Sequence, residues 1–269
     1  MKKKSIIDVI KGIIVGGSML VPGVSGATMA MILGIYDDLV KAVSSFFSHK
    51  RESIWLLGTF SIGGVIGILL FAKPLLYATE NWNMPMMYLF MGAVAGSVPM
   101  IFGKAGVRKF KVRDLLSILI GIVIVWMLAM LPTGLFVTDP NRGVIYTVLL
   151  VIAGIIAAVA LVLPGISVSY MLLVLGMYES TIQAIGDFSL SYLIPLAGGV
   201  LLGVILTTKI LETAMNKYGR TTYLIILGFV IGSILQVFPG VPKGLELVIC
   251  PVMFLISFII IRKLSALEN

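Results

Sequence analysis

The sequence predicts an all-α integral membrane protein made of two inverted-topology repeats, each a Pro-Gly-broken helical hairpin followed by three transmembrane helices. Three observations support this fold class. Hydrophobic residues make up 59% of the 269 residues, charged residues only 12%, and the mean hydropathy is +1.11, which is too apolar for a soluble domain of this length. One motif occurs twice, and the positive charges gather in alternate loops.

The duplicated motif begins with Pro-Gly-x-Ser in both halves of the chain. Its first copy, Pro22-Gly23-Val24-Ser25-Gly26 with Leu33-Gly34-Ile35-Tyr36-Asp37, returns 142 residues later as Pro164-Gly165-Ile166-Ser167-Val168 with Leu175-Gly176-Met177-Tyr178-Glu179. Over 22–46 and 164–188, 9 of 25 positions are identical. Hydrophobic segments that Gly and Pro interrupt at matching places in two halves of a membrane protein point to a transport site.

Ten apolar stretches, five in each half, define the predicted elements of one transmembrane domain. Repeat 1 covers 1–135, with a hairpin over 6–47 and transmembrane helices over 54–77, 86–103 and 114–131. Repeat 2 covers 136–269, with a hairpin over 144–186 and transmembrane helices over 190–208, 221–238 and 245–261. A helix of about 17–25 mostly apolar residues is long enough to cross the hydrocarbon core of a bilayer.

The loops between these stretches alternate in charge. Positive residues cluster at the N-terminus, at Lys50–Arg51, across 104–113, at 217–220 and in the C-terminal tail, whereas the loops near 78–85, 132–143, 187–190 and 239–244 carry few. The positive-inside rule therefore predicts that both termini are cytoplasmic. Because each half contains five stretches, an odd number, the second half is expected to enter the membrane in the opposite orientation.

The first two stretches of each half can form a re-entrant hairpin or two full crossings, since both return the chain to its starting side. Proline removes a backbone donor and glycine destabilises a helix, so the chain opens at Pro22-Gly23 and Pro164-Gly165. Open backbone at membrane depth persists only where protein or water satisfies it. We favour two re-entrant hairpins and six spanning helices, with ten spans as the alternative.

Each break offers a candidate phosphate site. Ser25 and Ser167 are suited to cap the helices that follow, and a helix start inside the membrane presents unpaired N–H groups and the positive end of its dipole. Two such starts that meet near the midplane would bind an anion without a buried Lys or Arg. The candidate phosphate-binding residues are Gly23, Ser25, Gly26, Thr28, Gly165, Ser167 and Ser169. The alternative is a pair of proline-kinked helices that bind no ligand.

Charged residues are further candidates for coupling or headgroup contact. Asp37 and Glu179 follow the repeated Tyr in both halves, and Asp8 lies in the first stretch; intramembrane carboxylates often carry a coupling ion, here H⁺ or Na⁺. The helix after each break is expected to reach these acids after about three turns. Lys73 and Lys209 occupy matching positions and are candidates for headgroup contact. The alternatives are solvated carboxylates and snorkelling lysines.

The composition argues against several other classes of site. The single cysteine, Cys250, allows no internal disulfide. The single histidine, His49, argues against a His-rich metal site and a Ser-His-Asp triad, so we expect no metal, no cofactor and no catalytic residue. The net charge of +8 lies mainly in short loops between apolar stretches, which indicates membrane topology and not nucleic-acid binding.

The residues around both breaks resemble a known family. Val21-Pro22-Gly23-Val24-Ser25-Gly26-Ala27-Thr28 with Leu33-Gly34-Ile35-Tyr36, and Leu163-Pro164-Gly165-Ile166-Ser167 in the second copy, are similar to the signature of bacterial polyprenyl-phosphate transporters (PopT-like), formerly a domain of unknown function. The resemblance covers essentially the whole chain. It implies a flippase that returns undecaprenyl phosphate from the outer to the inner leaflet of the bacterial cytoplasmic membrane, for cell-wall polymer synthesis, by alternating access.

Two other functions compete with this one. A secondary transporter or channel for a small inorganic anion would use the same helix starts, but it predicts a closed aqueous path, whereas a lipid transporter needs a lateral opening to the bilayer. A membrane enzyme such as a lipid phosphatase is not expected, because the chain has one histidine and no HExxH motif.

Overall fold

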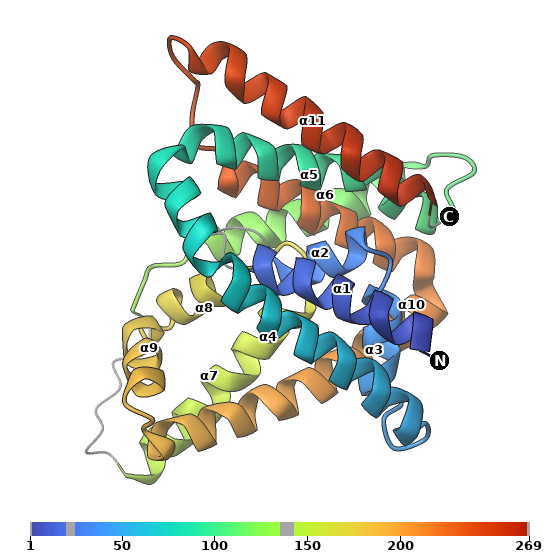
Figure 1. The fold of residues 1–269 in the computed structure, drawn as a ribbon. Helices are drawn as coiled ribbons and strands as arrows, with labels where there is room; N and C mark the ends of the chain where they lie inside the picture. Colours follow the sequence, from blue (N-terminus) through green and yellow to red (C-terminus); the bar gives the residue numbers. More distant parts are fainter. Residues whose placement is uncertain (1, 20–24, 135–142, 268–269) are drawn as a thin grey trace.

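The computed structural model describes residues 2–19, 25–134 and 143–267, and within these ranges all regular structure is helical (Figure 1). The helices are α1 (Lys2–Ser18), α2 (Gly26–Ile32), α3 (Tyr36–Ser44), α4 (Lys50–Asn81), α5 (Asn83–Lys104), α6 (Val112–Ala129), α7 (Val144–Val162), α8 (Val168–Val174), α9 (Tyr178–Gly186), α10 (Leu190–Val237) and α11 (Glu246–Leu267). The predicted all-α class is confirmed.

Six of the described helices are long and apolar enough to cross a membrane: α4, α5, α6, α7, α10 and α11. The sequence also predicts six spanning helices, but the two sets differ. The structure adds α7, which is predicted as one arm of a hairpin, and α10 unites the predicted helices 190–208 and 221–238 in one run of 48 residues. The chain is a multi-pass membrane protein.

The long helix α10 bends at Tyr218, whose φ of −131° and ψ of 39° are not helical. Trp82, which separates α4 from α5, has nearly the same conformation, with φ −133° and ψ 51°. The two residues are 136 positions apart, the spacing that also relates Gly63 to Gly199. α10 is therefore two arms, 190–217 and 219–237, which match α4 and α5 in the first half.

Glycines bring the long helices into backbone contact. A β-carbon on Gly63 of α4 would lie 2.1 Å from the Val9 oxygen of α1, and one on Gly199 of α10 would lie 2.1 Å from the Val151 oxygen of α7. Such distances leave no room for a side chain, and small residues of this kind let membrane helices approach closely. α1 thus packs on α4 as α7 packs on the first arm of α10.

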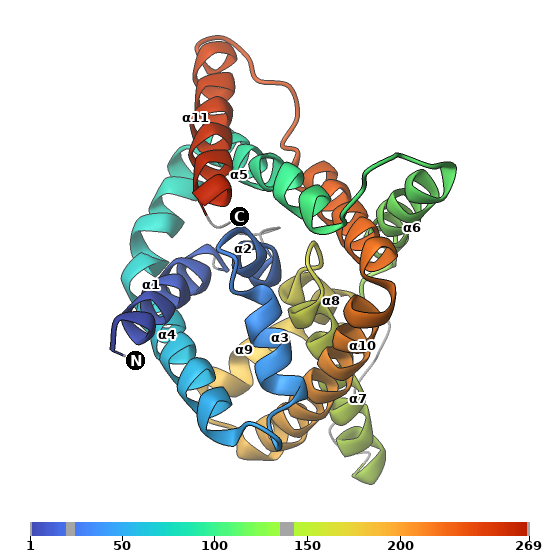
Figure 2. The ribbon, with the colours of Figure 1, turned by 90° about the vertical axis from the view of Figure 1, so that its right-hand side faces the viewer.

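The other long helices pair across the two halves of the sequence, and Figure 2 shows α5 beside α11. A β-carbon on Gly92 of α5 would lie 2.2 Å from the Phe254 oxygen of α11, and one on Gly228 of α10 would lie 2.2 Å from the Ile118 oxygen of α6. In each pair one helix lies before residue 135 and the other after it. Long helices of the first half therefore pack directly against long helices of the second half.

The second arm of each predicted hairpin is not one helix, so the expected continuous helix from the break to the acid is wrong. α2 ends before Gly34 (φ 62°) and α8 before Gly176 (φ 72°). Each end carries the same hydrogen bond, from the N–H after the glycine to the oxygen five residues earlier (Ile35 to Ala30, 3.0 Å; Met177 to Leu172, 2.8 Å). This is a Schellman termination, which favours glycine because its φ is positive. α8 and α9 are bent by 113°.

The two Pro-Gly breaks differ in what the structure describes. Pro22 and Gly23 lie within 20–24, outside the described residues. At the second break α7 ends at Val162 and α8 begins at Val168, so the chain leaves the helix around Pro164-Gly165, as predicted.

Candidate substrate site

The second break packs against the first copy of the motif. The backbone N–H of Gly165 donates a hydrogen bond of 3.0 Å to the hydroxyl oxygen of Thr28, a residue only 1% exposed. The Tyr36 hydroxyl donates to the backbone oxygen of Val162, the last residue of α7, at 2.9 Å. Both contacts connect the two halves, so the two copies of the motif meet inside the protein.

Gly165 is enclosed on two sides. Its φ is 81°, and a β-carbon there would lie 2.4 Å from the Phe229 oxygen of α10. Its N–H is bonded to Thr28. An anion can reach this N–H only after Thr28 moves away, so the arrangement is closed to an anion at Gly165.

Both predicted capping serines stand at helix starts. Ser25 precedes α2 and Ser167 precedes α8, each with extended backbone. The Ser167 hydroxyl oxygen accepts a hydrogen bond from the Tyr170 N–H at 3.4 Å, which confirms the cap of α8. Ser25 makes no such side-chain cap bond within the described chain. Each helix has seven residues, so both dipoles are short.

The remaining candidates at the breaks differ in exposure. Gly26 opens α2 and is covered by Met19, since a β-carbon on Gly26 would lie 2.7 Å from the Met19 sulfur. Ser169 is exposed in the first turn of α8, and Gly23 lies outside the described residues. The structure thus brings Thr28 and Gly165 together, and phosphate binding by the whole set stays a prediction.

The two predicted acids have different surroundings. The ammonium of Lys104, the last residue of α5, donates to Asp37 Oδ2 at 2.6 Å, and the Tyr223 hydroxyl of α10 donates to the same oxygen at 3.1 Å. Asp37 Oδ1 is buried without a hydrogen-bond partner among the described residues. Glu179, the matching acid, is exposed in the first turn of α9. Lys104 and Tyr223 are partners that no sequence spacing pointed to.

Lys73 and Lys209 do not join the site in this structure. Both residues are exposed, Lys73 on α4 and Lys209 on the first arm of α10. Exposure on an apolar helix is typical of a snorkelling lysine, and contact with a lipid headgroup stays a prediction.

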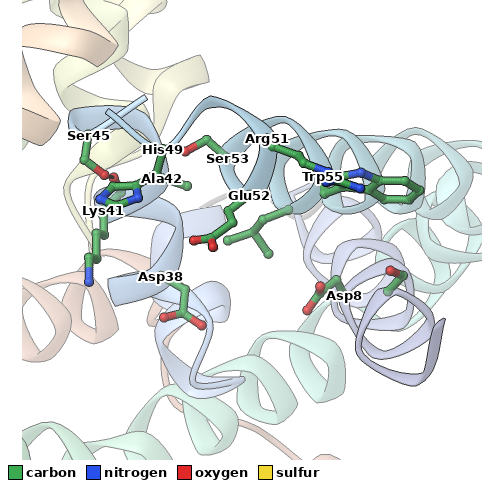
Figure 3. Close-up of a pocket in the computed structure, with 12 residues that line it drawn as sticks. Asp8, Asp38, Lys41, Ala42, Ser45, His49, Arg51, Glu52, Ser53 and Trp55 are labelled. Atoms are coloured by element: carbon green, nitrogen blue, oxygen red, sulfur yellow. Dashed lines mark hydrogen bonds between the residues drawn. The ribbon is translucent and has the colours of Figure 1, made fainter. Parts of the chain in front are cut away.

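A polar pocket of about 560 Å³ lies between α1, α3 and α4, and Figure 3 shows the side chains that line it. Asp8 lines it from α1 and is 8% exposed. The other titratable side chains of the lining are Asp38, Lys41, His49, Arg51 and Glu52. The pocket gives water a path to Asp8, one of the predicted coupling acids.

A second cavity, of about 260 Å³, is apolar and lies beside α2. Met29 lines it from α2, Phe90 from α5 and Ile260 from α11. Among the described residues of the lining, only Ser18 and Ser257 are polar. The cavity lies between the end of α1 and α2, because Ser18 ends α1 and Met29 lies in α2. No pattern in the sequence marks it, since its lining comes from helices far apart in the chain.

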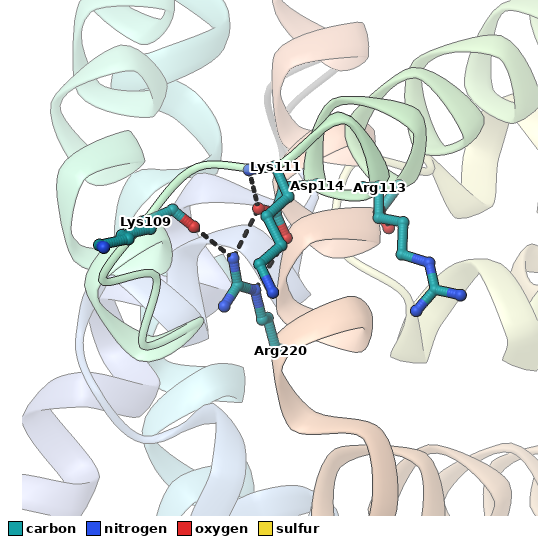
Figure 4. A network of polar contacts seen from close by, with 6 residues as sticks. Lys109, Lys111, Arg113, Asp114 and Arg220 are labelled. Carbon is teal, nitrogen blue, oxygen red and sulfur yellow. Dashed lines mark hydrogen bonds and ion pairs between the residues drawn. The ribbon is translucent and has the colours of Figure 1, made fainter.

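An ion pair holds the bend of α10 against α6 (Figure 4). Arg220 donates to both carboxylate oxygens of Asp114, at 2.8 and 2.6 Å, and to the Lys109 backbone oxygen at 2.8 Å. Asp114 is 4% exposed and also accepts the Lys111 N–H at 2.6 Å. The available signal in the sequence was the position of Asp114, an acid that directly follows the basic cluster 104–113.

The chain is similar to known transport proteins along most of its length. A family model described as undecaprenyl phosphate translocase-like matches residues 15–247. A polyprenyl-phosphate transporter of Staphylococcus aureus is 34% identical over an alignment of 272 positions, which covers 94% of each chain. One of Vibrio cholerae is 29% identical over 245 residues, which cover 86% of this chain and 76% of that protein. No solved structure matches significantly. The chain therefore belongs to the undecaprenyl phosphate translocase-like family, whose members are transporters and not enzymes.

Proposed function

We propose that this protein transports polyprenyl phosphate, returning undecaprenyl phosphate from the outer to the inner leaflet of the bacterial cytoplasmic membrane for cell-wall polymer synthesis. The names of the two relatives support the substrate class. The structural observation that carries the proposal is the hydrogen bond from Gly165 to Thr28, because it joins both copies of the motif at one point. Alternating access requires such a site between the two halves.

The two halves, 1–135 and 136–269, form inverted repeats in this proposal. The paired backbone contacts at Gly63 and Gly199 support it, as do the matching bends at Trp82 and Tyr218. In Figure 1 the start of α1, the end of α11 and the basic loop between α5 and α6 lie on the right, and the α4–α5 and α10–α11 connections lie on the left. We assign the right-hand side, with both termini, to the cytoplasm.

The space beside the hairpin is open in one half and filled in the other. The polar pocket is lined by Asp8 and Lys41, whose equivalents 142 residues later are Leu150 and Gln183. Leu150 belongs to a buried apolar cluster with Ala153, Leu175, Met177, Ala184, Tyr192 and Leu196. Inverted repeats would direct these two regions to opposite sides of the membrane. The difference supports an alternating-access cycle, here with the cytoplasmic side open.

The phosphate is assigned to the starts of α2 and α8. The Gly165 N–H and the Thr28 hydroxyl are bonded to each other in this structure, so the site opens only when the hairpins separate. Both groups then become available together, with Ser25 and Ser167 beside them, and a phosphate oxygen can accept from each. Binding energy would thereby drive the change between the two states.

The isoprenoid tail is assigned to the bilayer and to the apolar cavity beside α2. Met29 of α2 lines the cavity, so a headgroup at the start of this helix and the first part of the tail can be bound together. Its lining is almost entirely apolar, which suits an isoprenoid chain and not a hydrated inorganic ion.

The energy source is proposed to be a coupling ion, H⁺ or Na⁺. Asp8 is the best-placed carrier, because it is buried and lines the polar pocket, and Asp37 and Glu179 are further candidates. If the triple amide variant Asp8→Asn, Asp37→Asn, Glu179→Gln transports at the wild-type rate, coupling through these acids is excluded.

Purified protein in liposomes tests the function. A phosphatase outside the vesicles removes phosphate only from polyprenyl phosphate in the outer leaflet, so its progress curve reports movement between leaflets. We expect the wild type to accelerate the slow phase of this curve and the Ser25→Ala, Ser167→Ala double variant to accelerate it much less. Uptake of radiolabelled inorganic phosphate without lipid movement would instead support the small-anion transporter.

A further inference from the structure

Side chains from three helices meet at one carboxylate oxygen near the end of α5. The Lys104 ammonium (2.6 Å) and the Tyr223 hydroxyl (3.1 Å) both donate to Asp37 Oδ2. The ammonium also lies 5.9 Å from the centre of the Tyr223 ring, within the range of cation–π attraction. Lys104 and Tyr223 are thus held together beside the anionic oxygen that they share.

We propose that Lys104 and Tyr223 form an anion subsite for the phosphate of the transported lipid, and that the Asp37 carboxylate fills it as an internal competitor until the phosphate displaces it. This inference rests on the proposed lipid-phosphate transport. An ammonium and a phenol hydroxyl are suitable donors to phosphate oxygens. A phosphate monoester carries about −1.5 to −2 charge at pH 7 and three acceptor oxygens, so it attracts Lys104 more strongly than one carboxylate does.

The carboxylate is an incomplete occupant of this subsite. Asp37 Oδ1 is buried without a hydrogen bond in the described part of the chain, and a buried acceptor without a partner is unfavourable. The pair is also accessible, since the side chain of Lys104 is 21% exposed and that of Asp37 is 38% exposed. A ligand can reach Lys104, and Asp37 can turn toward solvent when it is displaced.

The second half of the chain is built without this cluster. At the 136-residue offset of the long helices, Lys104 corresponds to Gly240 and Tyr223 to Met87. Glu179, the counterpart of Asp37, is exposed. The helix packing that the two halves share therefore does not require the cluster. It lies beside the basic loop between α5 and α6, on the side assigned to the cytoplasm, where a phosphate from the outer leaflet would be released.

Binding to the purified full-length protein tests the subsite, with farnesyl phosphate and inorganic phosphate as separate probes in isothermal titration calorimetry. Asp37→Asn removes the competitor, and we expect the Kd to fall about tenfold. Lys104→Gln removes the main donor, and we expect the Kd to rise about tenfold or more. Tyr223→Phe should raise it less. Arg108→Gln in the same basic loop and Glu80→Gln on α4, both exposed, are matched controls that leave the Kd unchanged.

Opposite shifts for Asp37→Asn and Lys104→Gln support the proposal. If the ion pair were merely structural, both variants would shift the Kd in the same direction and lose equal thermal stability. That result would overturn the proposal. If only inorganic phosphate shows the opposite shifts, the subsite stands and the lipid function fails. If folded Asp37→Asn protein binds neither probe, the subsite itself is overturned, because Lys104 then has no competing carboxylate.

Discussion

Gly165 and Thr28 are 137 residues apart in the sequence, and the backbone N–H of Gly165 donates to the Thr28 hydroxyl oxygen at 3.0 Å. Each residue belongs to one copy of the duplicated motif. The bond therefore exists only while the hairpin of the first half touches the break of the second. The Gly165 N–H is therefore closed to an anion as long as the two halves pack together at this point.

Replacing Thr28 with Val keeps the shape of the side chain and removes the acceptor. The Gly165 N–H is then buried without a partner, which lowers the free energy of unfolding by about 1–3 kcal/mol. Unfolding of the purified protein in mixed detergent micelles measures this loss. Thr28→Ser, which keeps the hydroxyl, is the control. A Val variant as stable as the wild type would show that the hydrogen bond does not stabilise the contact.

Gly63→Ala tests the backbone contact between α1 and α4. The new methyl would lie 2.1 Å from the Val9 oxygen, so the helices must separate, at a cost of about 1–3 kcal/mol. Gly58→Ala on the same helix meets nothing within 4 Å, and it should be neutral or stabilise the helix by about 0.5–1 kcal/mol. Equal unfolding midpoints for the two variants would refute the close approach.

Arg220→Met leaves the carboxylate of Asp114 buried without its cation. Removing one partner of an ion pair is destabilising because the remaining charge loses its counterion. Because Arg220 is partly exposed, with 37% of its side chain accessible, we expect a measurable fall in the unfolding midpoint that is smaller than for a fully buried pair. The double variant Asp114→Leu, Arg220→Met should recover much of it. Arg113→Met is the control, since Arg113 is exposed and lies outside the ion pair in Figure 4. Additive losses in the double variant would argue against coupling between the two residues.

Cysteine labelling tests the difference between the two halves. Ser45 lines the polar pocket, and Ala184 lies in the buried apolar cluster of the second half. The native cysteine, Cys250, is buried and adds little background. In inside-out vesicles, a membrane-impermeant maleimide should modify Ser45→Cys rapidly, whereas Ala184→Cys should stay unmodified in the same vesicles. Equal labelling of the two variants would rule out a pocket open on one side only.

The helical class and the second break could be predicted, because both depend on local chemistry. Apolar stretches of sufficient length predict membrane helices, and Pro164-Gly165 interrupts a helix wherever it occurs. The ends of α2 and α8 were also present in the sequence, as a glycine before an apolar residue and a tyrosine. The sequence nevertheless predicted one continuous helix at each place, because the apolar run continues on both sides of Gly34 and Gly176.

The polar contacts could not be predicted in the same way. Asp37 bonds to residues 67 and 186 positions away, and no periodicity relates residues on different helices. The Asp37 carboxylate was predicted to matter because it recurs as Glu179. Asp37 bonds to Lys104 and Tyr223, whereas the equivalent positions in the other half are Gly240 and Met87, which cannot form the same contacts with Glu179. The repeated motif predicted the same contacts for both acids. The contacts differ because the residues that face Asp37 and Glu179 lie outside the motif.

The first measurement is the amount of undecaprenyl phosphate exposed on the surface of cells depleted of this protein, in a strain that lacks other transporters of this lipid. A reagent that binds the phosphate headgroup and cannot cross the membrane reports it. We predict accumulation that the wild-type protein reverses and the Ser25→Ala, Ser167→Ala variant does not. An unchanged amount on the surface of depleted cells would contradict the return of this lipid by the protein.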